Sequence, residues 1–313
     1  MRQRTPNAND MTRRPRLAVT GSTGLVGVAL CRAAAAAGWD VVRLVRTARG
    51  EAGTAAWDPA TGAIDAQALG VVDAVVHLAG ENVAGGRWTK ARKAAIADSR
   101  GPATEKLCRT LAALPQPPKV LVSASATGVY GDRGDAALDE ASAPGQGFLA
   151  DVARAWEAGT APLTQAGARV VLLRIGVVLA REGGALPRML PPFRLGLGGP
   201  LGSGKQWMSW ISLHDLVRAI LFALGCERLR GPALATAPTP VTNRDFGRAL
   251  GRVLRRPAVL PAPAFALRLL LGEMAQALLL SSQRCTPKAL AAAGFVYERG
   301  ELDGALRAVL AKG

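Results

Sequence analysis

The chain has 313 residues, of which 49% are hydrophobic and 20% are charged, as in a globular protein with a sizeable core. Its formal net charge of +16 comes mainly from arginines spread along the whole chain, and aromatic residues make up only 4%. Proteins that bind nucleic acids usually concentrate basic residues on one element and add stacking aromatics, so we expect no nucleic-acid partner. Attraction of an anionic small-molecule substrate stays open as a secondary role of this charge.

Cysteine spacing and the N-terminal residues bear on compartment and targeting. The four cysteines are far apart in sequence and only two histidines occur, so we expect reduced cysteines, no bound metal and a cytoplasmic location. The first residues are polar and lack the apolar core of a secretory signal. They predict a disordered tail over 1–14, with Met1 or Met11 as the start of translation.

The first part of the chain alternates short apolar runs with helical patterns. This alternation predicts an α/β protein whose parallel sheet is covered by helices on both faces. Right-handed crossovers make such a sheet doubly wound, as in a Rossmann-type fold. The predicted strands are 16–20, 40–45, 74–80, 119–125 and 168–176, and the predicted helices are 24–37, one within 89–113, and one over about 149–166.

After Arg174 the pattern changes. Residues 182–206 are rich in Gly and Pro, which predicts a long loop with one short helix near 185–195. Helix starts are expected where a capping residue is followed by a suitable first turn. The pairs with this pattern are Ser212 with Asp215, Thr242 with Asp245, and Thr286 with Pro287.

The most apolar long run is 263–280. Arg268 and Glu273 interrupt it, which favours a buried helix over a membrane span, so we expect no membrane partner. The chain from 261 onward reads as helical and predicts a small cap packed on the main domain.

A glycine triplet follows the first predicted strand. Gly21, Gly24 and Gly27 stand as G-x-x-G-x-x-G between that strand and the first helix. Gly21 permits a tight turn, Gly24 lets the backbone approach a pyrophosphate, and Gly27 allows close packing of helix on strand. The free N–H groups at the helix N-terminus would then hold the anion. In this context the triplet predicts a dinucleotide site; the alternative is a glycine-rich turn without a ligand.

The end of the second strand bears on which dinucleotide binds. NAD-binding proteins usually carry an acidic residue there, but Asp40 lies at the start of the strand and Arg46 at its end, with Arg43 and Arg49 nearby. A guanidinium suits the 2′-phosphate of NADP, so we expect NADP(H) rather than NAD(H). The alternative for Arg46 is a solvated side chain in an arginine-rich protein.

A second glycine-rich stretch resembles a P-loop. Gly199, Gly204 and Lys205 fit the start of G-x-x-x-x-G-K-[ST], but Gln206 stands where the Mg²⁺-binding hydroxyl belongs. Two prolines exclude a central strand before this stretch, and the next helix begins only near Leu213. We therefore expect this loop to lie on the substrate side, where Lys205 either meets an anionic group or is solvated.

Several motifs together resemble the atypical short-chain dehydrogenase/reductases of the NAD-dependent epimerase/dehydratase-like, or nucleoside-diphosphate-sugar epimerase-like, family. They are "TGSTGLVG", "VVHLAGENV", "VSASATGVYG" and "LRIGVVLAREGGALPRMLPPFRLGLGGPLGSGKQWMSWI", with the short C-terminal domain in "PAPAFALRLLLGEMA" and "SSQRCTPKALAAAGF". The resemblance spans about residues 16–310 and implies an extended Rossmann fold that binds a nicotinamide dinucleotide. By position the resemblance implies that the pyrophosphate is lined by Gly21, Thr23, Gly24, Leu25 and Val26. It also implies that Arg46 lies at the adenosine ribose. Under the cofactor it places Leu78, Ala79 and Gly80, with Arg100 nearby.

The sequence departs from that family in its catalytic pair. Members use a Tyr-x-x-x-Lys pair on the helix after the fifth strand, where tyrosine exchanges the proton and lysine lowers its pKa. Aligned on Glu157, this chain has Leu149 in place of the tyrosine and Ala153 in place of the lysine. Ala126 also replaces the usual hydroxyl residue. Any proton donor must therefore be a different residue.

Three other residues are candidates for catalysis. Tyr130 lies near the end of the fifth strand, where a structural role is the alternative; Ser125 could bind a substrate hydroxyl or serve as a turn residue. Glu81 could act as a base or be a charged loop residue without chemistry. His77 in an apolar strand and His214 in a helix first turn are expected to be structural.

Two functions stay open at this point. The first is an NADP(H)-dependent oxidoreductase or epimerase with unusual acid/base residues and a small-molecule substrate, which Lys205 and Trp207 would face. The second is a non-catalytic NADP(H)-binding sensor, which the missing pair favours. The expected domains are an NADP-binding domain over 15–260, with a substrate-side loop over 182–212, and a small helical C-terminal domain over 261–313.

Overall fold

The computed structural model describes residues 13–48 and 50–311. Most of the tail predicted over 1–14, both candidate start methionines, and Arg49 lie outside these residues. Arg13, which the prediction assigned to the tail, forms a 2.9 Å ion pair with Asp73. The contact ties the chain to the main domain just before the first strand.

A seven-stranded sheet forms the centre of the molecule, with the spatial order β11-β7-β5-β4-β1-β2-β3. All of its pairings are parallel, which confirms the doubly wound α/β fold. The five predicted strands correspond to β1, β2, β4, β5 and β7, whereas β3 and β11 were not predicted. The strands are β1 (Arg16–Thr20), β2 (Asp40–Val45), β3 (Thr54–Ala56), β4 (Ala74–His77), β5 (Val120–Ala126), β7 (Arg169–Ile175) and β11 (Gly231–Ala235).

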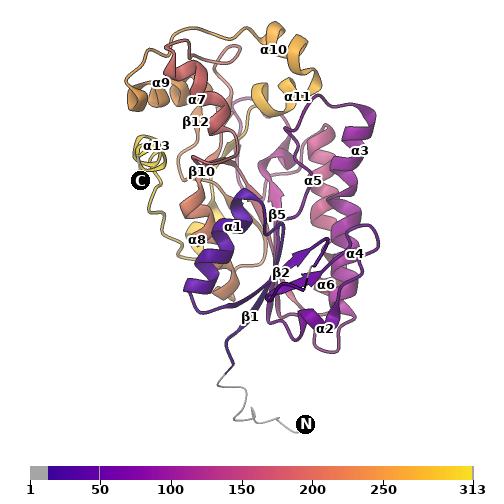
Figure 1. Cartoon of the computed structure of the whole chain (residues 1–313). Helices are drawn as coiled ribbons and strands as arrows, with labels where there is room; N and C mark the ends of the chain where they lie inside the picture. Colours follow the sequence, from indigo (N-terminus) through magenta and orange to yellow (C-terminus); the bar gives the residue numbers. More distant parts are fainter. Residues whose placement is uncertain (1–12, 49, 312–313) are drawn as a thin grey trace.

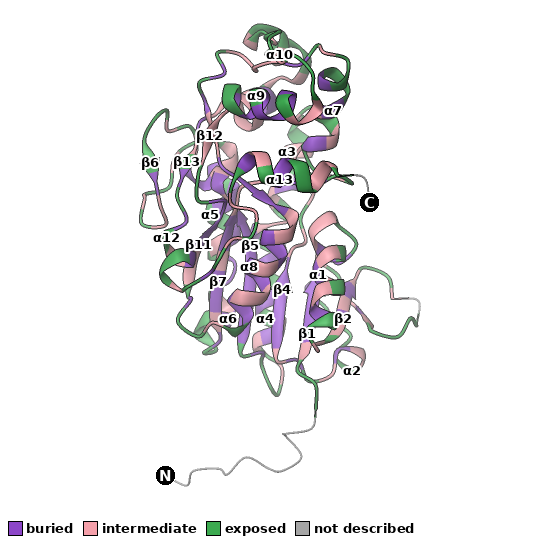
Figure 2. Ribbon diagram, turned by 90° about the vertical axis from the view of Figure 1, so that its left-hand side faces the viewer, coloured by how far each residue is buried: buried purple, intermediate pink, exposed green. Residues whose placement is uncertain are grey.

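Alternating side chains of each strand build two cores, one on each face of the sheet. Leu17 and Val19 of β1 pack with α1 (Leu25–Ala36) and α8 (Leu213–Gly225), while Ala18 faces the opposite core. That opposite core contains buried leucines of α2 (Ala66–Leu69), α4 (Gly101–Ala112) and α6 (Ala161–Gln165). Figure 1 shows the two helical layers on either side of the sheet, and Figure 2 shows the strands as the most continuously buried part.

Two predicted helices are each divided in the structure. The segment 89–113 forms α3 (Lys90–Asp98) and α4, and the segment 149–166 forms α5 (Phe148–Ala158) and α6. Each second helix carries a proline in its first turn, Pro102 in α4 and Pro162 in α6. Proline lacks an N–H and suits a helix start rather than an interior, which accounts for both divisions.

A third core lies beyond the carboxyl ends of the strands. It joins α7 (Leu186–Arg194), α9 (Asn243–Leu254) and α13 (Leu302–Leu310). Two of the three predicted capping residues are confirmed, because Ser212 accepts from the N–H of Asp215 and Thr242 from that of Asp245. The remaining short elements are a 3₁₀ turn (Thr127–Tyr130), β6 (Ala137–Leu138), β8 (Val177–Leu179), β9 (Trp207–Met208), β10 (Trp210–Ser212) and β12 (Val241–Thr242).

The C-terminal residues form a helical region, as predicted, and a short strand within it pairs with the main domain. They form α10 (Ala264–Leu271), α11 (Glu273–Ala275), a π turn (Gln276–Leu280), β13 (Arg284–Cys285), α12 (Lys288–Ala292) and α13. The strand β13 pairs with β6, and Leu290 and Phe295 enter the main core. This segment therefore crosses back over the first domain.

Two local predictions for this region were wrong. The run 263–280 is not one buried helix, because it breaks at Gly272 and no residue of α10 is buried. Thr286 is not an N-cap either, since α12 begins at Lys288 after Pro287 without a side-chain cap. No helix among residues 13–48 and 50–311 has the length and apolar character needed to span a membrane.

Candidate functional site

The strand order places a crevice beside the first glycine turn. The chain runs outward from β1 to β2 and β3, then returns to the other side of β1 as β4. Ligands of such sheets bind where the order reverses, at the carboxyl ends of the strands. The turn Gly21–Gly27 lies at the carboxyl end of β1, and Leu78–Gly80 lies at that of β4.

The three glycines differ in what a side chain would meet. Gly21 has a φ of +64°, and a Cβ there would lie 2.8 Å from the carbonyl carbon of Leu78. A Cβ on Gly27 would overlap the carbonyl oxygen of Gly21. A Cβ on Gly24 would meet only that same oxygen, at 3.3 Å. Gly21 and Gly27 are therefore required by the fold, whereas the fold places only one backbone oxygen near a side chain at Gly24.

The start of α1 fits an anionic group. It has no side-chain cap and no acidic residue in its first turn, so its N–H groups are not used by the side chains of the described protein. The buried hydroxyl of Ser22 has no hydrogen-bond partner within residues 13–48 and 50–311. Thr23 is exposed, and Leu25 and Val26 are half-buried. These donors match the needs of a pyrophosphate.

A chain of buried hydrogen bonds holds the carboxyl ends of β1 and β4 together. The hydroxyl oxygen of Thr20 accepts from the N–H groups of Leu78 and Ala79, at 3.1 and 3.2 Å. Its own proton is then free to reach Nδ1 of His77, 2.7 Å away, and Nε2 of His77 lies 2.8 Å from the hydroxyl of Thr104. Burial, with a smaller contribution from Arg100, lowers the pKa of His77 to about 4. His77 is therefore a neutral structural residue.

Arg46 follows the last residue of β2 and is exposed. Its neighbour in the strand, Arg43, is engaged in a 3.1 Å ion pair with Glu51. Asp40 lies at the far end of the strand, beside Arg16. No acidic residue therefore stands at the carboxyl end of β2 itself.

Arg100 anchors the loop that follows β4. Its guanidinium donates to the carbonyl oxygens of Ile96 and Glu81, and it stacks 4.9 Å from the ring of Trp156. Burial lowers the pKa of Arg100 to about 10, although the charge of Glu81 opposes the shift. Gly80 lies so close that a Cβ there would be 3.1 Å from the guanidinium carbon. Arg100 thus positions the backbone at Gly80 and Glu81.

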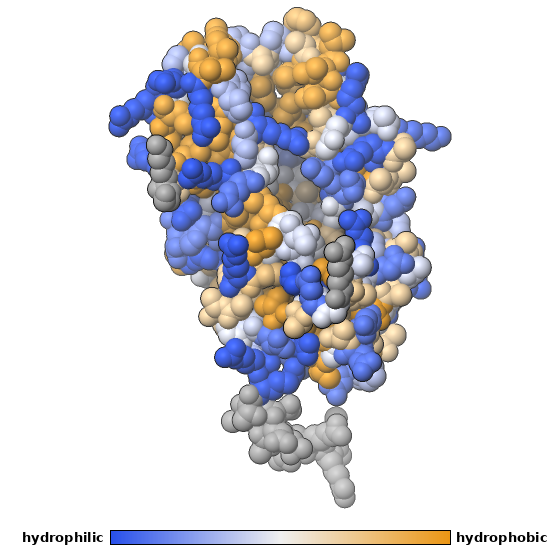
Figure 3. Space-filling view, viewed as in Figure 1, coloured by the Kyte–Doolittle hydropathy of each residue, from blue (hydrophilic) through white to orange (hydrophobic). Residues whose placement is uncertain are grey.

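The loop over 81–89 is fixed by donors from several elements. Arg188 of α7 donates to the carbonyl oxygen of Ala84, and the indole of Trp88 donates to that of Val83. The carboxylate of Glu81 forms a 3.0 Å ion pair with Arg92 and is about two-fifths exposed. Figure 3 shows the molecule hollowed near the centre of this face, between the α7–α11 end and the sheet. An ordered loop beside a hollow is suited to holding a small molecule.

Sequence reasoning missed the buried ion pair under this site. Arg174 of β7 donates through Nε and Nη2 to the two carboxylate oxygens of Glu157, at 2.8 and 2.9 Å. Ser125 donates to the same carboxylate at 2.7 Å. Burial opposes the charge of Arg174, but the hydrogen bonds and charge of Glu157 outweigh it and raise the pKa of the guanidinium. The only sign of this ion pair in the sequence was Glu157, an acidic residue on an otherwise apolar face of its helix.

Tyr130 and Ser125 are both committed to this network. The hydroxyl of Tyr130 accepts from Arg174 and donates to the carbonyl oxygen of Asp139, each at 2.8 Å. Burial raises the pKa of Tyr130 to about 12, and its side chain is fully buried. Ser125 is 2% exposed. Their placement favours structural roles.

The positions expected for the catalytic pair lie on α5. Ala153 is buried in a small core with Tyr130, and Leu149 lies 3.5 Å from where a Cβ on Gly128 would be. Neither side chain carries an ionisable group.

The second glycine loop is built differently from a P-loop. It follows α7 rather than a strand, and β9 rather than a helix follows it. Gln206 is buried and donates to the carbonyl oxygens of Leu201 and Leu279. Lys205 is exposed. The glutamine therefore connects the loop to the C-terminal segment. The elements on either side of the loop are not the strand and helix of a P-loop, as the sequence predicted.

Trp207 begins β9 beside this loop. Its indole donates to Asp135 at 2.9 Å, and the guanidinium of Arg284 stacks 4.4 Å from its ring.

The described residues contain no cluster of three His, Cys, Asp or Glu side chains that could hold a metal ion.

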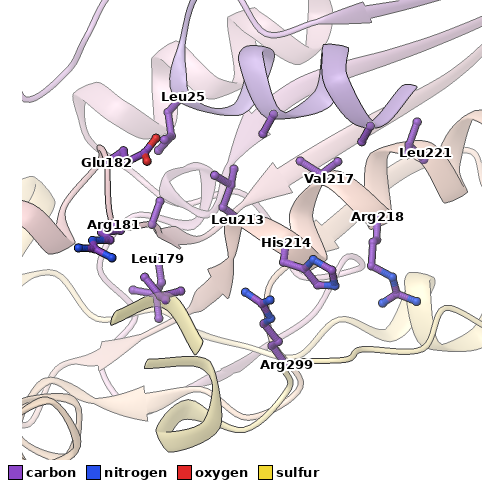
Figure 4. A pocket seen from close by; sticks show the side chains of 14 residues that line it. Leu25, Leu179, Arg181, Glu182, Leu213, His214, Val217, Arg218, Leu221 and Arg299 are labelled. Carbon is purple, nitrogen blue, oxygen red and sulfur yellow. The ribbon is translucent and has the colours of Figure 1, made fainter. Parts of the chain in front are cut away.

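A pocket of about 460 Å³ lies on the outer side of α1, between α1 and α8. Figure 4 shows Leu25, Leu213, Val217 and Leu221 lining it, with His214 and three arginines toward the C-terminal segment. His214 is bound to Glu298 at 2.6 Å. Of the glycine-turn residues, only Leu25 lines this pocket.

The parallel sheet, its strand order and the glycine turn at its reversal point define a Rossmann-type, NAD(P)-binding protein of the short-chain dehydrogenase/reductase kind. Residues 17–231 match the NAD dependent epimerase/dehydratase family, and residues 262–309 match a domain of unknown function (DUF1731). The chain belongs to this epimerase family.

Relatives of similar length support the assignment. An epimerase family protein of Mycobacterium bovis is 46% identical over 290 residues, 93% of this chain and 96% of that protein. Human epimerase family protein SDR39U1 is 36% identical over 95% of this chain and all of that protein. The solved structure of human SDR39U1 with NADPH has a TM-score of 0.86 at 35% identity, covering 94% of this chain and 98% of that one.

Proposed function

We propose that this chain binds NADP(H) at the Gly21–Gly27 turn and uses it in a reductase- or epimerase-type reaction on a small molecule. The observation that carries the proposal is the close approach of Gly21 to Leu78, beside an uncapped α1 N-terminus. When bound, the nicotinamide supplies or accepts a hydride. In the proposed arrangement Thr23, Gly24, Leu25 and Val26 line the pyrophosphate.

The choice of NADP(H) rests on Arg46. It is exposed at the end of β2, where an acidic residue would favour NAD(H). The human relative was solved with NADPH, which supports the same choice here. A lost contact between a guanidinium and the 2′-phosphate costs about 1.5–3 kcal/mol. Arg46→Ala should therefore weaken NADPH by at least about tenfold and change NADH little.

Titration of both cofactors against both proteins tests this choice. Arg43→Ala is the matched control, because the Arg43 guanidinium is already paired with Glu51. NADPH should lose affinity in Arg46→Ala and keep it in Arg43→Ala. Equal affinities of the wild type for NADPH and NADH would overturn the proposal.

The acid/base chemistry would come from outside the usual pair. Leu149 and Ala153 cannot exchange protons, and the hydroxyls of Ser125 and Tyr130 are bonded within the protein. Glu81 is the candidate that stays partly exposed, on the loop after β4. We therefore assign it the role of base. Glu81→Gln should abolish turnover while NADPH still binds, with Glu51→Gln, an exposed acid beyond β2, as control.

The substrate side would be formed by the loop 182–212. In this arrangement Lys205 and Trp207 face the substrate, residues 15–260 form the cofactor domain, and residues 261–313 form the C-terminal domain. The donors that fix loop 81–89, above all Arg188 from α7, support an ordered wall opposite the cofactor.

One observation favours a second function, a non-catalytic NADP(H) sensor. The hydroxyls of Ser125 and Tyr130 are both committed to structural bonds. Mass spectrometry of a denatured extract of the purified protein distinguishes the two. NADP(H) accompanied by a metabolite that the protein then converts supports the enzyme, whereas NADP(H) alone with no turnover supports the sensor.

A further inference from the structure

Large apolar side chains are exposed at the α9–α10 end of the molecule, the top of Figures 1 and 2. Their exposed fractions run from 49% to 77%, and Figure 3 shows apolar surface gathered at this end. We call this surface the apical patch. It consists of Leu195, Leu197, Val259, Leu260, Phe265, Leu269 and Leu270.

Two segments that are distant in sequence form the patch, and backbone hydrogen bonds join them. The N–H of Leu260 donates to Gly198, that of Ala262 donates to Pro200, and that of Gly202 donates back to Ala262. The stretch after α7 and the stretch before α10 therefore run side by side. The seven side chains belong to one end of the fold rather than to scattered sites.

The helix α10 is apolar on all sides except for Arg268. Phe265 and Leu269 stand one turn apart and are 73% and 77% exposed, and none of the helix is buried. A helix of this composition is normally covered, and a contiguous exposed apolar patch marks a contact site. The patch therefore needs an occupant.

The charges around the patch indicate the chemistry of that occupant. The segments 194–202 and 255–273 carry four exposed arginines and one acid, Glu273, which is already paired with Lys93 at 2.9 Å. A second copy in a two-fold contact would bring the same arginines against these, which opposes self-association. A partner that has a negatively charged surface and an apolar interior beneath it would complement both the arginines and the apolar side chains of the patch. The arginines are Arg194, Arg255, Arg256 and Arg268.

We propose that the apical patch binds the surface of a membrane that carries anionic lipids. Phe265, Leu269 and Leu270 enter the boundary between headgroups and acyl chains, and the arginines stay at the level of the phosphates. Contact of this kind lies in the membrane surface and needs no spanning helix. It therefore departs from the sequence expectation of no membrane partner, which rested on the lack of a spanning segment. It does not depend on cofactor binding.

Co-sedimentation of the full chain with vesicles tests the proposal. One set of vesicles contains phosphatidylcholine alone, and the other contains equal parts of phosphatidylcholine and phosphatidylglycerol. The wild type should bind the second set at least about tenfold more tightly, and high salt should weaken this binding. NADPH affinity, measured in parallel, reports whether each variant is folded.

Paired variants separate the apolar and the charged contributions. Phe265→Ser combined with Leu269→Ser should reduce binding to the anionic vesicles by at least about tenfold. Arg194→Gln combined with Arg268→Gln should remove the preference for phosphatidylglycerol. Val296→Ser is the matched control, because Val296 is 70% exposed outside the patch, and it should bind as the wild type does.

Three outcomes would overturn the proposal. The first is that the sedimented fraction of the wild type is the same with anionic vesicles as in their absence. The second is a Val296→Ser variant that loses as much binding as the patch variant. The third is a stable dimer, seen by analytical ultracentrifugation, that the patch substitutions dissociate while vesicles are not bound; the occupant is then a second copy.

Discussion

The carboxylate of Glu157 and the guanidinium of Arg174 form a two-point ion pair beneath the crevice, with side chains only 13% and 6% exposed. The pair joins α5 to β7 and also receives the hydroxyl proton of Ser125. Glu157 is thereby held by three hydrogen bonds within the protein.

Breaking this ion pair should be costly. Glu157→Gln leaves the buried charge of Arg174 without its counter-charge, so the free energy of unfolding should fall by about 3–5 kcal/mol. Glu298→Gln is the control, since Glu298 is 55% exposed and its pairs should contribute no more than about 1 kcal/mol. Denaturant unfolding at neutral pH measures both. Similar losses of unfolding free energy in the two variants would show that the buried ion pair stabilises the protein no more than an exposed one does.

Stability should depend on pH through His77. Its pKa is about 4 when folded and 6.5 when unfolded, because burial disfavours the charged ring. Below 6.5 the unfolded chain takes up this proton first, so the stabilisation present above that pH is lost as pH falls toward about 4. The full loss is about 3 kcal/mol.

The variant His77→Gln removes that titration. Its free energy of unfolding should fall less steeply than that of the wild type between about pH 7 and pH 5. Denaturant unfolding at several pH values supplies the slopes. Parallel curves for wild type and His77→Gln would contradict the assignment.

Ordinary dehydrogenase activity should be absent. With simple alcohols and ketones, absorbance of the reduced nicotinamide should stay at its background rate, because Leu149 and Ala153 cannot exchange protons. For any substrate that is converted, Leu149→Phe should not reduce kcat/KM by the several orders of magnitude that follow loss of a catalytic tyrosine. Rapid turnover of simple alcohols would show that the catalytic pair is elsewhere on the chain.

The glycines of the first turn should separate into structural and ligand-facing positions. Gly21→Ala forces a side chain into a positive φ and against Leu78, so it should destabilise the protein by more than about 1 kcal/mol. Gly24→Ala should cost less, because it meets only one backbone oxygen at 3.3 Å. Thermal unfolding compares the two. Equal destabilisation would mean that Gly24 is also held by the fold.

The sequence was sufficient for the sheet and the glycine turn, because strand periodicity and glycine spacing are local signals. The boundaries of β1 and β2 and the caps at Ser212 and Thr242 follow from such signals. The strand β13 could not be predicted, since Arg284 and Cys285 become a strand only by pairing with β6, about 150 residues earlier.

The same limit applies to the site. Ser125, Tyr130 and Glu81 could be named from their positions, but their partners could not. Tyr130 is bonded to residues of β7 and of the loop after β6, and Glu81 is ion-paired with Arg92 of α3. The hydroxyl of Ser125 is committed only because Glu157 reaches it from α5. The exposure of α10 was also hidden, because an apolar run does not tell whether the fold covers it.

The central claim is that phosphate groups bind at Gly21–Gly27 and not at Gly199–Lys205. The most direct measurement is calorimetric titration of NADPH into folded Gly24→Val and Lys205→Ala. Gly24→Val puts a side chain where the pyrophosphate passes and should abolish binding, whereas Lys205→Ala should keep the affinity within about threefold, under about 1 kcal/mol. ATP with Mg²⁺ should show no specific binding to the wild type. NADPH binding that survives Gly24→Val but is lost in Lys205→Ala would contradict the account.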